Sequence, residues 1–80
     1  MVKKMIPLTE LRAGEHGKVT AFQGGFGLAR RLEAMGLRIG TKVTKISDQF
    51  MRGPVTIKAG HTGLALGFGM AGKITVEIEK

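Results

Sequence analysis

RRLEAMGLRIG, residues 30–40, predicts a short helix, the end of that helix and the start of the next strand. Leu28, Leu32 and Met35 recur at the i, i+4 and i+7 spacing, which places three side chains on one face of a helix. The helix is only about ten residues long and is not expected to be stable alone. It must therefore pack against the rest of the domain.

The end of this helix is marked by Gly36 and Leu37. Glycine enters the left-handed conformation at little cost, and helices often end with a residue in that conformation. Leu37 then stands where a Schellman motif makes an apolar contact back to Leu32. The sequence therefore predicts a glycine-capped helix that turns sharply into a strand.

The rest of the chain reads as β-structure, with short alternating runs separated by glycines. The clearest run places Ile74, Val76 and Ile78 on one face. The run at residues 54–59 also alternates cleanly, with its odd-numbered apolar residues on one face. In another run Val43 and Ile46 lie three apart, which breaks the period of two and indicates a bulge or bend. We expect five strands, over residues 18–23, 41–47, 54–59, 64–66 and 73–79, with a tight connection at residues 60–63 and a bend at residues 67–72.

These patterns predict an all-β (mainly β) fold, a small closed five-stranded barrel with one short α-helix after the first strand. Closure of the barrel would remove the edges that an open sheet exposes. Residues 1–80 are expected to form a single domain, and the absence of cysteine excludes disulfides and thiolate metal sites. Before the first strand, Leu8 and Leu11 are expected to point inward, and Gly14 and Gly17 to mark a turn.

The net charge is +7 at pH 7, which favours an anionic partner such as nucleic acid, an acidic protein face or a membrane surface. The basic residues are dispersed, however, and no block of five like charges is present. A solvated basic surface that serves solubility is the alternative. The N-terminus lacks the apolar segment of a signal peptide, and no apolar run is long enough to span a membrane. We therefore expect a cytoplasmic protein.

Neither a metal site nor a catalytic site is predicted. His16 and His61 are the only histidines, and no ligand spacing joins them to carboxylates. The lone Ser47 has no candidate base nearby in the sequence. The run at residues 24–27, GGFG, precedes the helix, but it lacks the lysine and hydroxyl residue of a phosphate-binding loop and is interpreted as a structural turn.

Two surfaces are candidates for binding a partner. Arg30 and Arg31 lie off the apolar stripe of the helix, where they contact an acidic partner or, as the alternative, only solvent; Arg30 could also pair with Glu33. The second candidate surface consists of Phe50, Met51 and Arg52 in a loop. An apolar pair on a loop either binds a partner or covers one end of the barrel.

The order and spacing of several short motifs resemble the ferrous iron transport protein A (FeoA) family over nearly the whole chain. The motifs are PLTEL at residues 7–11, RRL at 30–32, MGL at 35–37, GP at 53–54 and LAL at 64–66. The resemblance implies an SH3-like barrel, a cytoplasmic location and a non-enzymatic role in ferrous iron uptake. It further implies binding to the cytoplasmic G domain of FeoB, the membrane Fe(II) transporter, and modulation of that transporter.

The same resemblance implies that the protein meets a membrane only through this partner and that no nucleic acid is bound. No resident cofactor is expected, and Fe(II) or another transition metal would bind only weakly or at a site shared with a partner. After Leu66 the chain departs from a common form of the family pattern, since residues 67–71 read GFGMA in place of a charged turn. The alternative function is a small RNA-binding SH3-like barrel, which four phenylalanines without tyrosine or tryptophan disfavour.

Overall fold

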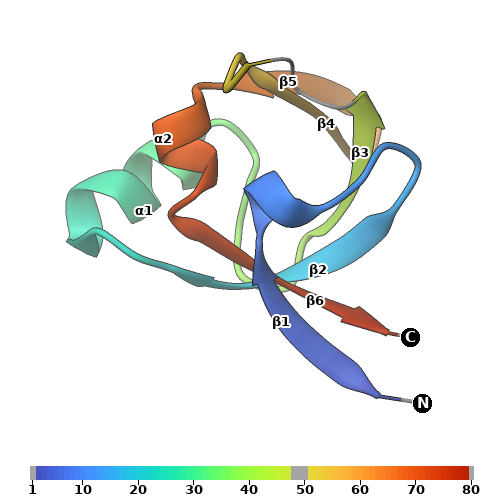
Figure 1. The fold of residues 1–80 in the computed structure, drawn as a ribbon. Helices are drawn as coiled ribbons and strands as arrows, with labels where there is room; N and C mark the ends of the chain where they lie inside the picture. Colours follow the sequence, from blue (N-terminus) through green and yellow to red (C-terminus); the bar gives the residue numbers. More distant parts are fainter. Residues whose placement is uncertain (1, 48–50, 80) are drawn as a thin grey trace.

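Six antiparallel strands form one sheet in the order β1-β6-β2-β3-β4-β5 (Figure 1). The computed structural model describes residues 2–47 and 51–79. Along the chain the elements are β1 (Lys3–Pro7), the 3-10 turn η1 (Leu8–Glu10), β2 (His16–Phe22), α1 (Gly25–Ala34), β3 (Lys42–Ser47), β4 (Val55–Ala59), β5 (Thr62–Leu66), α2 (Phe68–Ala71) and β6 (Ile74–Glu79). The predicted mainly β fold is confirmed, and α1 follows the predicted first strand.

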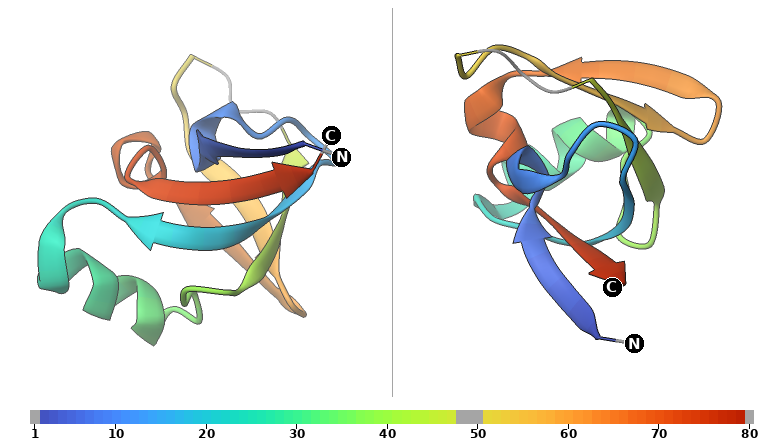
Figure 2. Two further views of the ribbon diagram at one scale, coloured as in Figure 1. Left: turned by 90° about the horizontal axis from the view of Figure 1, so that it is seen from below. Right: turned by 45° about the vertical axis from the view of Figure 1, so that its right-hand side comes forward.

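The sheet curls on itself into a small SH3-like barrel (Figure 2). Two irregularities in strand pairing accompany this curvature, one between Val19 and Ala21 in β2 and one between Lys45 and Ser47 in β3. Bulges of this kind bend a strand and increase its twist. The second irregularity confirms the bulge expected in the 41–47 strand. The expected full closure is wrong for the described part of the chain, because β1 and β5 remain the two edges of the sheet.

The prediction of five strands was wrong because the N-terminal segment forms β1. This strand pairs with β6 along its whole length, from Lys3 opposite Glu79 to Pro7 opposite Thr75. Only Ile6 is buried in β1, so the segment lacks the alternation that identifies a half-buried strand. Pairing with β6, rather than a local pattern, therefore makes it a strand.

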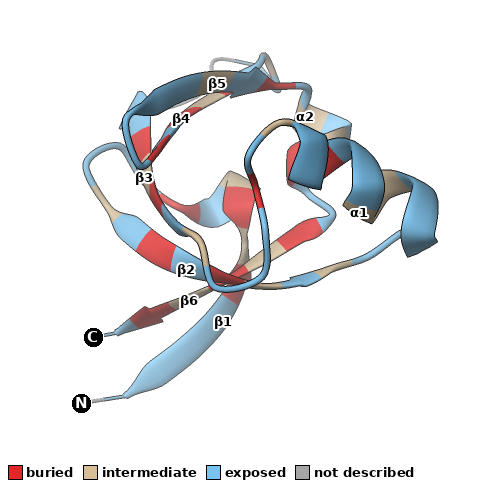
Figure 3. Cartoon of the chain, turned by 180° about the vertical axis from the view of Figure 1, so that it is seen from behind, coloured by how far each residue is buried: buried red, intermediate tan, exposed pale blue. Residues whose placement is uncertain are grey.

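The core consists of aliphatic side chains from all six strands, from η1, α1 and α2, and from the loops between these elements (Figure 3). In β5 only the last residue is buried. The predicted inward faces of β4 and β6 are confirmed, as are the inward positions of Leu8 and Leu11. The buried hydrophobic residues are Ile6, Leu8, Leu11, Val19, Leu32, Leu37, Val43, Val55, Ile57, Ala59, Leu66, Ala71, Ile74, Val76 and Ile78.

A lysine interrupts this apolar core in β3. Lys45 is fully buried, and its Nζ donates a hydrogen bond to the Leu11 carbonyl oxygen at 2.8 Å. Its apolar neighbour Ile46 is half exposed, so the irregularity in β3 places the lysine inward and the isoleucine outward. The buried ammonium group ties β3 to the segment that follows η1.

Helix α1 ends as the sequence predicts. Leu32 is fully buried, while Leu28 and Met35 are partly buried and pack against the core. Gly36 has φ +98°, and the Leu37 N–H donates to the Leu32 carbonyl oxygen at 2.8 Å. The Gly36 N–H donates to the Glu33 carbonyl oxygen at 3.0 Å, which completes both bonds of a Schellman motif.

Three turn predictions need correction. Gly17 lies within β2 rather than in a turn, and a Cβ at this position would lie 3.0 Å from the Glu77 carbonyl oxygen, so glycine allows β2 and β6 to approach closely. The β4–β5 connection consists of Gly60 and His61 alone. Residues 68–71 form the single helical turn α2 instead of a bend. Among the described residues, no helix is long and apolar enough to cross a membrane.

Candidate functional site

The first candidate surface is the outer side of α1, where Arg30 and Arg31 are both exposed. The buried position of Leu32 fixes the inner side of the helix and leaves these guanidinium groups in solvent. Arg30 does not pair with Glu33, and the only ion pair between two described residues joins Lys3 and Glu77 at 3.5 Å. The two arginines are therefore available for contact with a negatively charged partner.

The second candidate surface is the turn that precedes β4. Met51 has 84% of its side chain exposed, and the Arg52 guanidinium carbon lies 5.9 Å from the centroid of the Phe68 ring in α2. Met51 and Arg52 have φ values of +51° and +61°, a conformation that non-glycine residues seldom adopt. Phe50, the third residue predicted here, lies outside the described residues.

The structure does not join these two surfaces. In Figures 1 and 2 the turn with Met51 and Arg52 lies at the β4 end of the barrel, away from α1. Arg30 and Arg31 are adjacent to each other on α1. The stacking of Arg52 on Phe68 ties the second surface to α2.

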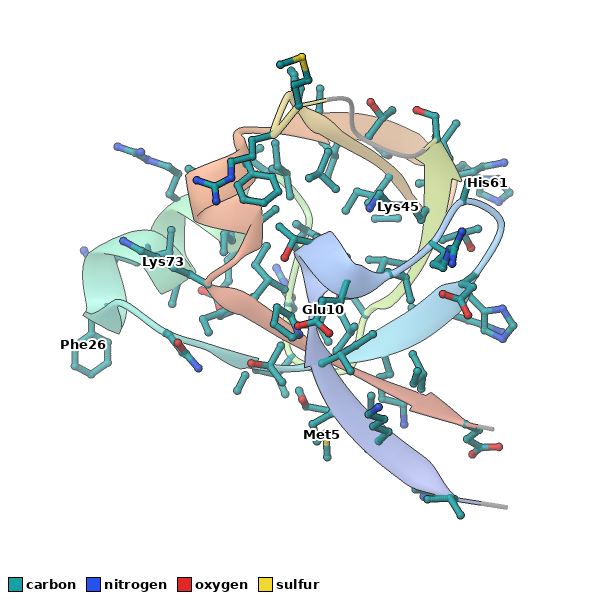
Figure 4. The ribbon with its side chains drawn as sticks, viewed as in Figure 1. Met5, Glu10, Phe26, Lys45, His61 and Lys73 are labelled. Atoms are coloured by element: carbon teal, nitrogen blue, oxygen red, sulfur yellow. The ribbon has the colours of Figure 1, made fainter. Side chains whose placement is uncertain are left out.

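The two histidines come from different elements of the fold. His16 lines an open groove of about 610 Å³ between β1, β2, β3 and β6, together with Glu15, Glu77 and Glu79. His61 is exposed in the β4–β5 turn (Figure 4). Within residues 2–47 and 51–79 no group of three histidine or carboxylate side chains is placed to hold a metal ion. Neither histidine hydrogen-bonds to a hydroxyl group within the same ranges.

A further feature of α1 was missed by the sequence analysis. Phe26, in the run interpreted only as a structural turn, is 90% exposed, and Ile39 is 58% exposed. Both line a shallow apolar depression of about 300 Å³ together with Phe22, Gly25 and Ala29. The available signal was the position of Phe26, two residues before Leu28 and hence on the opposite side of the helix from the buried stripe.

The strand-to-helix turn shows no features of a phosphate site beyond the helix start itself. Gly24 is the N-cap residue of α1, with φ +122°, and no side chain caps the helix. A Cβ on Gly24 would lie 3.6 Å from the Lys73 Cδ, so the stem of this lysine covers the start of the helix. This geometry agrees with the structural interpretation of the turn.

Comparison with known proteins identifies the family to which this chain belongs. The FeoA domain model matches residues 6–78. A curated relative from Methanocaldococcus jannaschii, named "Putative Fe(2+) transport protein A", is 40% identical over 73 residues, which cover 91% of this chain and 87% of the relative.

Solved structures agree with this assignment. A crystal structure described as the iron uptake regulatory protein FeoA superposes with a TM-score of 0.85 at 30% identity and covers 94% of this chain and 100% of that chain. A manganese-dependent transcriptional repressor superposes with a TM-score of 0.82 at 17% identity, over 95% of this chain and 42% of that chain, which shows the shared fold alone. The chain therefore belongs to the FeoA domain family, a family involved in Fe(2+) transport.

Proposed function

We propose that this protein is a non-enzymatic, cytoplasmic accessory protein of ferrous iron uptake that binds the cytoplasmic part of FeoB and modulates the transporter. Its family membership supports the role in iron transport. The observation that carries the binding role is the exposed pair Arg30 and Arg31, which stands on a helix whose other side is held by the core. An acidic face of the G domain would complement this pair.

A protein partner is supported over RNA by the position of the aromatic side chains. Single-stranded RNA is usually bound by aromatic rings exposed on a sheet face. The only phenylalanine in the described strands is Phe22, which is partly buried against the core, and the one other aromatic ring in those strands is the exposed imidazole of His16. The described part of the sheet therefore offers no set of exposed rings on which successive bases could stack.

We further propose that the isolated protein holds no tightly bound metal, and that Fe(II) meets it only weakly or at a site shared with its partner. The lack of any group of three histidine or carboxylate side chains placed for a metal ion, among the described residues, supports this proposal. Equilibrium dialysis against Fe(II) or Zn(II) is expected to show no stoichiometric binding at micromolar metal. Stoichiometric retention that is abolished by His16→Ala or His61→Ala would contradict it.

The test of the proposed function uses the double variant Arg30→Glu, Arg31→Glu. It is expressed in cells that lack the native protein, and both Fe(II) uptake and co-purification with FeoB are measured. Reversal of both charges replaces attraction with repulsion at the proposed interface, so uptake and co-purification should both fall.

The matched control is the double variant Arg12→Glu, Lys58→Glu, which changes the net charge equally at two exposed positions outside the proposed surface. It should retain uptake and co-purification. Normal uptake and normal co-purification by a folded Arg30→Glu, Arg31→Glu variant would place the interface elsewhere. Equal losses in both double variants would mean that only the overall charge matters.

A further inference from the structure

The end of the molecule formed by the start of α1 and the turn before β3 is apolar and projects outward. Phe26 and Ile39 come from different segments and line the same depression, yet 90% and 58% of these side chains remain exposed. Figure 4 shows the Phe26 ring directed away from the body of the molecule at the outer end of α1. Folding alone does not explain two large apolar side chains left in water at one tip.

Cationic side chains surround this tip. Arg30 lies one helical turn from Phe26 and therefore on the same side of α1, and Arg38 directly precedes Ile39. Lys73 reaches the tip from the chain before β6, where its stem covers Gly24.

Acidic side chains are concentrated elsewhere. Between residues 22 and 42 the only acid is Glu33, which lies near the far end of α1. Glu15, Glu77 and Glu79 line the groove close to the chain termini, together with Lys3, Lys18 and Lys42. Figure 2 shows the termini and α1 on opposite sides of the molecule. The segment that carries the apolar tip therefore contains a single acid, in a chain whose net charge is +7.

We propose that this tip docks on an anionic lipid bilayer, with Phe26 and Ile39 inserted at the interface and with Arg30, Arg38 and Lys73 at the headgroups. Apolar side chains that enter the boundary between headgroups and acyl chains, flanked by lysine and arginine, are typical of proteins that bind at membrane surfaces. Negatively charged lipids add an attraction for each nearby cation. This inference goes beyond the proposed binding to FeoB, and it departs from the expectation, drawn from the family resemblance, that the protein meets a membrane only through its partner.

The shape of the tip favours docking on a bilayer over binding an anchoring side chain of a protein partner in a pocket. Pockets that hold a ligand or an anchoring residue enclose most of its surface. Here one wall of the depression is Phe26 itself, which is almost fully exposed and cannot enclose an inserted group. A projecting ring is instead suited to enter a soft apolar phase.

The chain offers a direct probe, because it contains no tryptophan and no tyrosine. The Phe26→Trp variant places the only indole at the tip, and Met51→Trp is the matched control at another exposed apolar position. Each variant is titrated with vesicles of phosphatidylcholine alone and with vesicles in which about one third of the lipid is phosphatidylglycerol. Quenching by lipids brominated on the acyl chains reports insertion.

We expect the Phe26→Trp emission to move to shorter wavelength and to be quenched only with the anionic vesicles. Met51→Trp should do neither. Reversal of two flanking charges by Arg38→Glu and Lys73→Glu should weaken the partitioning of Phe26→Trp at least about tenfold, whereas the Arg12→Glu, Lys58→Glu pair should weaken it less. These charge variants leave the arginine pair of the proposed FeoB surface intact.

Co-sedimentation of the unlabelled protein keeps the proposal testable if the indole disturbs folding. The native chain should sediment with anionic vesicles, and Phe26→Ser should reduce that fraction severalfold. The proposal is overturned if the Phe26→Trp emission does not change and the native chain does not sediment with anionic vesicles. It is also overturned if the protein binds neutral vesicles as strongly as anionic ones, or if the emission of Phe26→Trp and Met51→Trp shifts equally. Since the vesicles contain no protein, any of these outcomes leaves the proposed binding to FeoB standing.

Discussion

The two ends of α1 differ in how the surrounding structure holds them. At the C-terminal end, Leu32 and Leu37 are fully buried, and Gly36 completes both hydrogen bonds of a Schellman motif. At the N-terminal end no side chain caps the helix, and Phe26 projects into solvent. Folding accounts for the residues at the first end, whereas those at the second end contribute little to the core.

Stability alone does not explain the N-terminal end of the helix. A helix that served only to cover the barrel would gain from a capping side chain and from alanine in place of a glycine with ordinary helical φ. The chain instead has Gly27 next to an exposed phenylalanine, whereas Gly25 has φ +81°, which favours glycine. Arg30 and Arg31 follow on the outer side, so the exposed side of α1 is the part of the molecule best placed to meet other molecules.

The largest expected loss of stability is at the C-terminal end of α1, which the core anchors. Leu32→Ala removes a fully buried side chain from the middle of the helix stripe and should lower the free energy of unfolding by about 2–5 kcal/mol. In so small a domain this loss could abolish folding. Thermal and urea denaturation measure it, and a melting temperature within a few degrees of the native value would show that α1 does not pack as described.

A smaller loss is expected at the helix end. Gly36 has φ +98°, and a Cβ there would meet no other atom within 4 Å, so the cost of a side chain comes from the backbone conformation. Gly36→Val should lose about 1–2 kcal/mol, and Gly36→Asn should lose less because asparagine tolerates positive φ better than a β-branched residue. Equal losses in denaturation would mean that the conformation of Gly36 does not limit stability.

A gain in stability is expected at the N-terminal end of α1. Gly27 lies within α1, and a Cβ at this position would meet no atom within 4 Å. Gly27→Ala should therefore raise the free energy of unfolding by about 0.5–1 kcal/mol, since alanine loses less backbone entropy in a helix. Urea denaturation beside the native protein measures this gain. A decrease in stability would show that the start of α1 is under constraints that its open surroundings do not reveal.

The anchored end could be predicted from the sequence because its determinants are local. The spacing of Leu28, Leu32 and Met35, followed by Gly36 and Leu37, contains both the buried face and the cap. The clean alternation of β4 and β6 likewise predicted which of their side chains enter the core. The family resemblance added the SH3-like barrel.

Features that depend on distant partners could not be predicted in the same way. β1 is a strand because β6 pairs with it, and its own residues show no alternation. Lys45 is buried because the Leu11 carbonyl accepts its hydrogen bond and a bulge in β3 turns Ile46 outward. Phe26 was overlooked because its glycine neighbours dominate the local pattern.

The candidate site divides in the same way. The exposure of Arg30 and Arg31 follows from the helix stripe alone, whereas the stacking of Arg52 on Phe68 joins segments that the sequence does not relate. In the proposed complex, the surface that meets FeoB depends on the shape and charge of that partner, which the sequence of this chain does not contain.

The most direct test of the central claim measures stability and binding on the same variant. Calorimetric titration of full-length FeoB in nanodiscs of phosphatidylcholine alone compares the native protein, the Arg30→Glu, Arg31→Glu variant and the Arg12→Glu, Lys58→Glu control, and urea denaturation gives the free energy of unfolding of each. We expect the first double variant to keep its free energy of unfolding within about 0.5 kcal/mol and to bind at least about 100-fold more weakly, while the control binds as the native protein does. Native affinity in a folded Arg30→Glu, Arg31→Glu variant would contradict the assignment of the outer side of α1 to partner binding.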